Sequence, residues 1–158
     1  VFITLLHMGR RRVETLLAER EACYDYLHTQ LVALAERQQQ RVLATPGNPI
    51  SIAVTLDNPF PDCATFEYGD KQITQFGAML YTRGVSGARC VPFHNKKSVG
   101  KYEFSNYGSH CEGYPHAYFT AAAAIGIERE DVDVFIERLE KNWKQYTKDL
   151  EKQKGVST

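Results

Sequence analysis

The sequence predicts an α+β domain in which a small, mostly antiparallel sheet is covered by helices. Two observations carry this prediction. Long segments near both ends place apolar residues at helical spacing, and several short runs between them are β-branched and bounded by glycine and proline turns. Read in order, the expected helices are 1–8, 13–40, 71–83, 116–125 and 131–152, and the expected strands are 41–45, 50–57, 85–93 and 101–104.

The two long helices are predicted by apolar stripes at spacings of three, four and seven. In 13–40 the stripe consists of Val13, Leu17, Tyr24, Leu27, Leu31 and Leu34. In 131–152 it consists of Val132, Ile136, Leu139, Trp143, Tyr146 and Leu150. Lysines fall on the opposite face of the last helix, where they are either an ordinary solvated surface or a row of cations for a phosphate backbone. These lysines are Lys141, Lys144, Lys148 and Lys152.

Turn chemistry separates the shorter elements. Gly9 interrupts the first apolar run, and 46–49 (Pro-Gly-Asn-Pro) forms a turn before the alternating strand 50–57. The segment 58–70 has no period, so we expect a long loop there. The segment 95–100 reads as a turn and is followed by the short strand 101–104, which together predict a hairpin.

The centre of the chain, 74–92, holds the residue of greatest functional interest. Gly84 is expected to end a helix, because glycine adopts the left-handed cap without steric cost. In the strand that follows, small and apolar residues surround Arg89. A guanidinium presents donors in a rigid plane that suits phosphate and guanine edges. The alternative is an edge-strand arginine in solvent.

Composition narrows the class of protein. The 158 residues have zero net charge and are 43% hydrophobic, so contact with a nucleic acid would need local basic patches. No apolar run approaches a membrane span. The cysteines lack metal-site spacing, so we expect free thiols in the cytoplasm and no bound metal. They are Cys23, Cys63, Cys90 and Cys111.

No catalytic residues are predicted in this chain. His110 and Cys111 are neighbours, and neighbouring residues of an extended segment point in opposite directions, so they make a poor dyad. Ser109 has no evident acid partner. The lysines of the middle segment lie in exposed turns or strand ends, where an imine would not be desolvated. These are Lys71, Lys96, Lys97 and Lys101.

Several uncommon strings occur together in the order found in one family. They are 48–51 (Asn-Pro-Ile-Ser), 85–89 (Val-Ser-Gly-Ala-Arg), 114–115 (Tyr-Pro) and 124–126 (Ala-Ile-Gly), within a resemblance that runs from Val1 to about Lys141. On these strings the chain resembles the O-phosphoseryl-tRNA(Sec) selenium transferases (SepSecS, the soluble liver antigen), and specifically a C-terminal fragment of one.

The resemblance implies a fold-type-I transferase that uses pyridoxal 5'-phosphate and selenophosphate to convert O-phosphoseryl-tRNA(Sec) to selenocysteinyl-tRNA(Sec). It implies that Arg89 reads the base before the CCA end, and that Lys152 or Lys154 contacts the acceptor arm. The Schiff-base lysine would lie upstream, so the cofactor is not expected in this fragment and the fragment alone is expected to be inactive.

The resemblance also implies an organisation. Residues 1–12 would end the linker and large-domain region, 13–154 would form the C-terminal small domain, and 155–158 would be a tail. The loop 58–70 is longer than the family pattern, which implies an insertion within the small domain. The absence of an initiator methionine favours a piece of a longer chain. A homotetramer is expected by analogy. Two alternatives stay open: the small domain of another fold-type-I enzyme acting on a small amino acid, and a non-catalytic interaction module.

Overall fold

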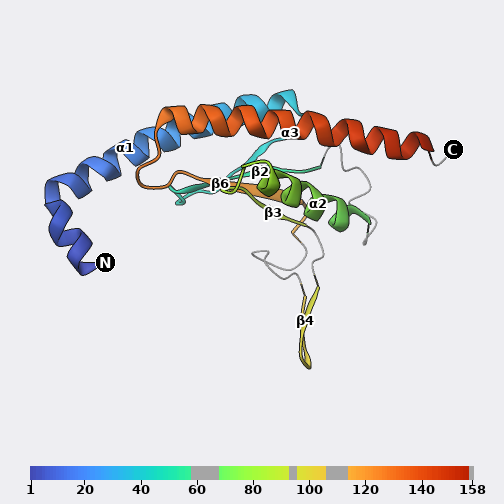
Figure 1. The fold of residues 1–158 in the computed structure, drawn as a ribbon, viewed down its shortest axis with the longest axis horizontal. Helices are drawn as coiled ribbons and strands as arrows, with labels where there is room; N and C mark the ends of the chain where they lie inside the picture. The colour runs from blue at the N-terminus through green and yellow to red at the C-terminus, as the bar shows by residue number, and fades with distance from the viewer. Residues whose placement is uncertain (58–67, 93–95, 106–113, 157–158) are drawn as a thin grey trace.

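A computed structural model describes residues 1–57, 68–92, 96–105 and 114–156 (Figure 1). The helices are α1 (Phe2–Arg37), α2 (Tyr68–Thr82) and α3 (Arg129–Val156). The strands are β1 (Val42–Leu43), β2 (Ser51–Thr55), β3 (Arg89–Val91), β4 (Lys97–Val99), β5 (Tyr102–Phe104) and β6 (Tyr118–Ala122). Two long helices flank the strands in sequence, which confirms the predicted α+β class.

The main sheet has four strands in the order β1-β2-β6-β3, and every pairing is antiparallel. The central pair is β2 with β6, in which Ala53 lies opposite Thr120. On its other side β6 pairs with β3, where Arg89 lies opposite Thr120. The strands β4 and β5 form a separate hairpin. A hairpin was predicted here, but its first strand, β4, lies within 95–100, the segment that was expected to be the turn.

All three helices cover one face of this sheet. Helices α1 and α3 lie side by side along it (Figure 1), while α2 packs against β3 and α3. The core between the layers contains Phe76 of α2, Phe119 of β6 and Trp143 of α3, all almost fully buried. The predicted stripe of α3 is buried along its whole length. In the stripe of α1 the residues from Leu27 onward are buried, whereas Leu17 is 44% exposed.

The opposite face of the sheet carries a smaller apolar cluster. Strand side chains alternate between the two faces, so Ala53, Val91 and Tyr118 point away from the helices. These three residues are buried and pack with Leu43 and Tyr114. Arg89 and Thr120 share this face, which none of the described helices covers, because they are two residues from Val91 and Tyr118 along their strands.

The predicted helix 116–125 is wrong: this segment contains β6, the strand between β2 and β3. The alanine run favours a helix by local propensity. Here the decisive pattern is alternation, with Phe119 and Ala121 packed in the helix-covered core and Thr120 on the other face. Two flanking strands satisfy its backbone groups, and this tertiary pairing overrides propensity.

Other boundaries also shift. Residues 68–70, expected in the loop 58–70, begin α2, and the remainder of that loop lies outside the described residues. Helix α1 ends at Arg37 rather than near residue 40, and β3 is shorter than 85–93. The predicted break at Gly9 is confirmed by its non-helical backbone angles (φ 68°, ψ 168°). The domain boundaries at 12 and 154 stay predictions.

Candidate nucleic-acid interface

Arg89 is the first residue of β3, at an outer edge of the main sheet. Its side chain is exposed, and its register places it on the face opposite the described helices. The prediction that Arg89 lies in a strand is therefore confirmed. An arginine in this position is accessible to a ligand approaching the sheet from the side opposite the helices.

The connection between α2 and β3 is fixed against α3. Gly84 adopts φ 79° and ends α2, as predicted. Arg138 of α3 donates a hydrogen bond from Nη1 to the carbonyl oxygen of Gly84 at 2.9 Å, and Arg83 donates from Nη1 to Oδ1 of Asn142 at 3.3 Å. Val85 is buried beside them. The segment that leads to Arg89 is thus held by a long helix rather than suspended in a loop.

Cys90 anchors β3 from the helix-covered side. It packs on the main core, and an added Cβ at Gly77 of α2 would lie only 3.2 Å from the Cβ of Cys90. Burial raises the pKa of the Cys90 thiol to about 12, so this cysteine is a neutral packing group at ordinary pH. The close approach at Gly77 sets the position of the strand that begins with Arg89.

The lysines of α3 differ in their ion pairing. Lys141 pairs with Glu137, and Lys144 lies 3.1 Å from Glu140, which also contacts Arg37 of α1. Within the described part of the chain, Lys148 and Lys152 have no ion-pair partner. Both are exposed. The positive charge of this helix is therefore least compensated toward its C-terminal end, where Lys154 continues the same helix.

The structure does not bring Arg89 and Lys152 together. Arg89 lies on the face of the sheet opposite the described helices, whereas α3 covers the other face. Arg138 contacts Gly84, and Lys152 lies fourteen residues further along α3, which corresponds to roughly 21 Å of helix. A ligand that contacts both residues must be large enough to extend around the β3 edge.

A polar cluster that the sequence analysis missed lies where β2 ends and β6 begins. His116 Nδ1 lies 3.0 Å from a carboxylate oxygen of Asp57, and its Nε2 contacts a guanidinium nitrogen of Arg41. The guanidinium has no acceptor, so in this contact Nε2 is the accepting nitrogen and Nδ1 is the nitrogen that faces the carboxylate. The residues come from three segments with no shared spacing, and the only signal in the sequence was the position of Asp57 at the end of the predicted strand 50–57.

The same cluster is tied to the sheet by hydrogen bonds around Thr55 and Gln40. Thr55 is almost fully buried, and its hydroxyl donates to Oε1 of Gln40 at 2.8 Å while accepting from the backbone amide of Arg41 at 3.1 Å. The amide of Asp57 donates to the same Gln40 oxygen at 2.9 Å. These bonds hold Arg41 and Asp57 in place on either side of His116.

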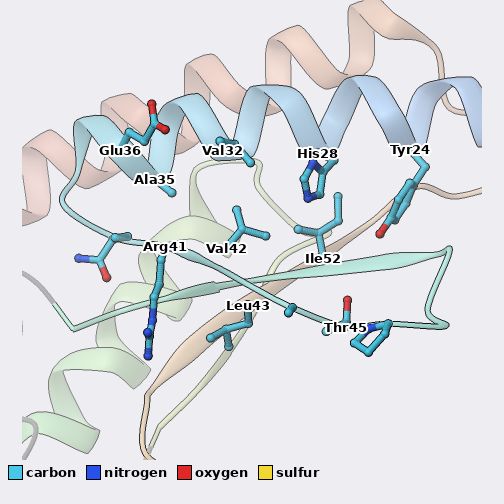
Figure 2. A pocket seen from close by; sticks show the side chains of 13 residues that line it. Tyr24, His28, Val32, Ala35, Glu36, Arg41, Val42, Leu43, Thr45 and Ile52 are labelled. Atoms are coloured by element: carbon cyan, nitrogen blue, oxygen red, sulfur yellow. The ribbon is translucent and has the colours of Figure 1, made fainter.

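A groove of about 700 Å³ lies between α1 and the β1 segment (Figure 2). Tyr24 and His28 point into it from α1, and Val42 points toward the helix from β1. The side chain of Arg41 points away from α1, and the carboxylate of Glu36 points away from β1 (Figure 2). These two charged groups therefore do not converge on the groove. The groove therefore lacks the set of converging polar groups that orients a small ligand.

Every lysine whose side-chain burial the structure describes is exposed, including Lys71, Lys96, Lys97 and Lys101. A Schiff-base lysine needs a lowered pKa, which comes from desolvation or a neighbouring cation. Among the same described residues, no group of acidic, histidine or cysteine side chains is arranged to hold a metal ion. Ser109, His110 and Cys111 lie outside the described residues.

None of the described helices is long and apolar enough to cross a bilayer.

The described cysteines, Cys23 and Cys90, are free thiols. Cys63 and Cys111 lie outside the described residues.

Comparison with known proteins identifies the family. Residues 1–144 match the family model described as O-phosphoseryl-tRNA(Sec) selenium transferase, SepSecS. The chain is 37% identical over 150 residues to the O-phosphoseryl-tRNA(Sec) selenium transferase of Dictyostelium discoideum, covering 89% of this chain and 31% of that protein. It is 27% identical over 152 residues to the Caenorhabditis elegans enzyme of the same name, covering 96% and 30%.

The fold agrees. The crystal structure of an archaeal O-phosphoseryl-tRNA(Sec) selenium transferase matches with a TM-score of 0.64 at 22% identity, over 89% of this chain and 27% of that one. The chain therefore belongs to the SepSecS family of selenium transferases, as its sequence motifs predicted. It spans about a third of the length of the curated relatives it matches. The family model ends at residue 144, so Lys152 and Lys154 lie beyond the matched range.

Proposed function

We propose that this chain is the part of a selenium transferase that holds the acceptor end of O-phosphoseryl-tRNA(Sec). The observation that carries the proposal is Arg89, exposed at the start of an edge strand within the family-matched range. Its planar set of donors suits bidentate recognition of a guanine edge or a phosphate. In this role Arg89 reads the base that precedes the CCA end.

Lys152 and Lys154 would supply a second, less specific contact. Lys152 is exposed and has no ion-pair partner among the described residues, and it lies in the most weakly compensated part of α3. A lysine is a point charge that attracts phosphates without reading bases. We infer that this contact strengthens binding of the acceptor arm equally for different sequences.

The chemistry belongs to the rest of the protein. Pyridoxal phosphate would supply an electron sink there, and selenophosphate would be the selenium donor. The exposed lysines of the described chain support this division, because none of them sits in a desolvated pocket. The chain alone would therefore bind and orient the tRNA end and would not turn it over. Assembly as a homotetramer in the cytoplasm belongs to the same proposal.

The test is a turnover assay on the full-length protein with phosphoseryl-tRNA(Sec), selenophosphate and pyridoxal phosphate. The amino acid esterified to the tRNA is released and identified. We expect selenocysteine, with none formed by residues 1–158 alone.

Two other results would overturn the proposal. A cofactor spectrum without turnover of the tRNA would favour an enzyme acting on a small amino acid. No cofactor spectrum in the full-length protein would favour a non-catalytic interaction module.

A further inference from the structure

The hairpin of β4 and β5 stands away from the main sheet (Figure 1). All six of its strand residues are exposed. A two-stranded hairpin is at best marginally stable in water when it has no third layer to cover it. An exposed hairpin with this composition therefore points to a surface that receives a partner.

One face of the hairpin is apolar. Lys97 lies opposite Phe104, and Val99 lies opposite Tyr102. Residues that are directly opposite, or two apart on one strand, share a face, so these four side chains form one surface and Ser98 and Glu103 form the other. On the apolar face Tyr102 is 62% exposed and Phe104 is 47% exposed. Two aromatic rings are thus presented on neighbouring positions of a projecting strand.

Cations border these rings. Between residues 96 and 104 there are three lysines and a single acidic residue, Glu103. Gly100 adopts φ 61° at the turn, and the following Lys101 places its Nζ 5.4 Å from the centre of the Tyr102 ring. A surface built for a purely apolar partner would not place charges at this density around its aromatic residues. Positive charge beside stacking rings is instead typical of surfaces that bind single-stranded nucleic acid.

We propose that the β4–β5 hairpin is an arm that binds single-stranded RNA, namely the unpaired 3′ strand of the tRNA. Tyr102 and Phe104 provide the surface on which bases stack, and Lys96, Lys97 and Lys101 contact phosphates. This inference rests on the proposed function, which makes tRNA the substrate. Lys97 is eight positions after Arg89, and an extended chain spans at most about 3.5 Å per residue, so their Cα atoms lie within roughly 28 Å. One RNA strand can therefore meet both.

The experiment measures equilibrium binding of the full-length protein to tRNA(Sec) and to the same tRNA trimmed of its unpaired 3′ nucleotides. The variants are Tyr102→Ala and Phe104→Ala, with Tyr102→Phe as the conservative change and Ser98→Ala as the control on the opposite face. Because these side chains are exposed, the variants are expected to fold. Their melting temperatures and assembly states are compared first.

We expect each alanine variant to bind intact tRNA(Sec) roughly five- to 150-fold more weakly, the loss that follows from removing one stacked base contact. Tyr102→Phe and Ser98→Ala should bind as the unmodified protein does. On the trimmed tRNA all five proteins should have equal affinity.

Three results would overturn the proposal. If the alanine variants bind intact tRNA as tightly as the unmodified protein, the hairpin is not an RNA arm, although the proposed function stands. If the variants dissociate the assembly without RNA, the hairpin contacts a second copy of the chain. If the unmodified protein does not bind tRNA(Sec), the proposed function fails together with this inference.

Discussion

At the scale of single residues, the position of Arg89 depends on how the neighbouring residue of β3, Cys90, packs on the other face of the sheet. Cys90, the next residue, points into the helix-covered core and meets α2 at Gly77, where there is little space for a side chain. Arg89 points to the opposite face because consecutive strand residues alternate. The partly buried Cys90, with a neutral thiol, thus fixes the position of the exposed Arg89, and the pKa of that thiol offers a direct test.

We predict that Cys90 makes the protein less stable at alkaline pH. Burial raises the pKa of its thiol from 9.0 to about 12 in the folded state. The stabilisation is therefore complete below about pH 9 and is lost as the pH rises toward 12, because only the unfolded chain ionises easily. At pH 10, about one unit above the unfolded pKa, the loss should be about 1.4 kcal/mol.

Urea unfolding of the unmodified protein and of Cys90→Ala between pH 8 and about pH 10 measures this effect. The free energy of unfolding should fall more steeply with pH in the unmodified protein. Tyrosines that ionise in the same range are common to both proteins and cancel in the comparison. Parallel pH curves would show that the Cys90 thiol ionises as easily in the folded state as in the unfolded chain.

At the scale of elements, α3 connects the layers. Its Trp143 packs edge-on against Phe76 of α2 at 5.3 Å and against Phe119 of β6 at 6.3 Å between ring centres. Two residues of the same helix, Arg138 and Asn142, hold the α2–β3 connection. The helix therefore positions the segment that carries Arg89 while its outer face stays charged.

We predict that Trp143→Ala destabilises the chain by about 3–5 kcal/mol, because it leaves a cavity where three elements meet. Chemical denaturation followed by circular dichroism measures the change. Lys148→Ala, on the exposed face of the same helix, should alter stability by less than about 0.5 kcal/mol. A loss below about 1 kcal/mol for Trp143→Ala would mean that the ring does not join α2 to β6.

At the scale of the whole molecule, the elements that could be predicted from the sequence are those whose type follows from the local spacing of apolar residues. The apolar stripe predicts the buried face of α3, and the alternating, β-branched run 50–57 predicts a strand. Both predictions are confirmed, although β2 is buried on both faces of the sheet. The strand β6 was missed because its alanines favour a helix locally, and only its neighbours β2 and β3 make it a strand. Chain position alone could not reveal the Arg41, Asp57 and His116 cluster, since folding brings three distant segments together.

The candidate interface was predictable only in part. The strings around Arg89 indicated the family, and the structure confirms that this arginine begins a strand. The sequence did not reveal that Arg89 lies on one face of the sheet while α3, which carries Lys152, covers the other face. That separation depends on which face of the sheet the helices cover. Two separate contacts imply two separable effects on RNA binding.

The measurement that tests the central claim most directly is binding of the full-length protein to two tRNA(Sec) molecules that differ only in the base before the CCA end. The proteins compared are the unmodified form, Arg89→Ala and Lys152→Ala. We predict that Arg89→Ala loses about 1–3 kcal/mol of discrimination between the two tRNAs. Lys152→Ala should weaken binding of both equally and reduce its salt dependence, as the loss of a phosphate contact does. Discrimination that is unchanged by Arg89→Ala would contradict the assignment of this chain as the reader of the acceptor end.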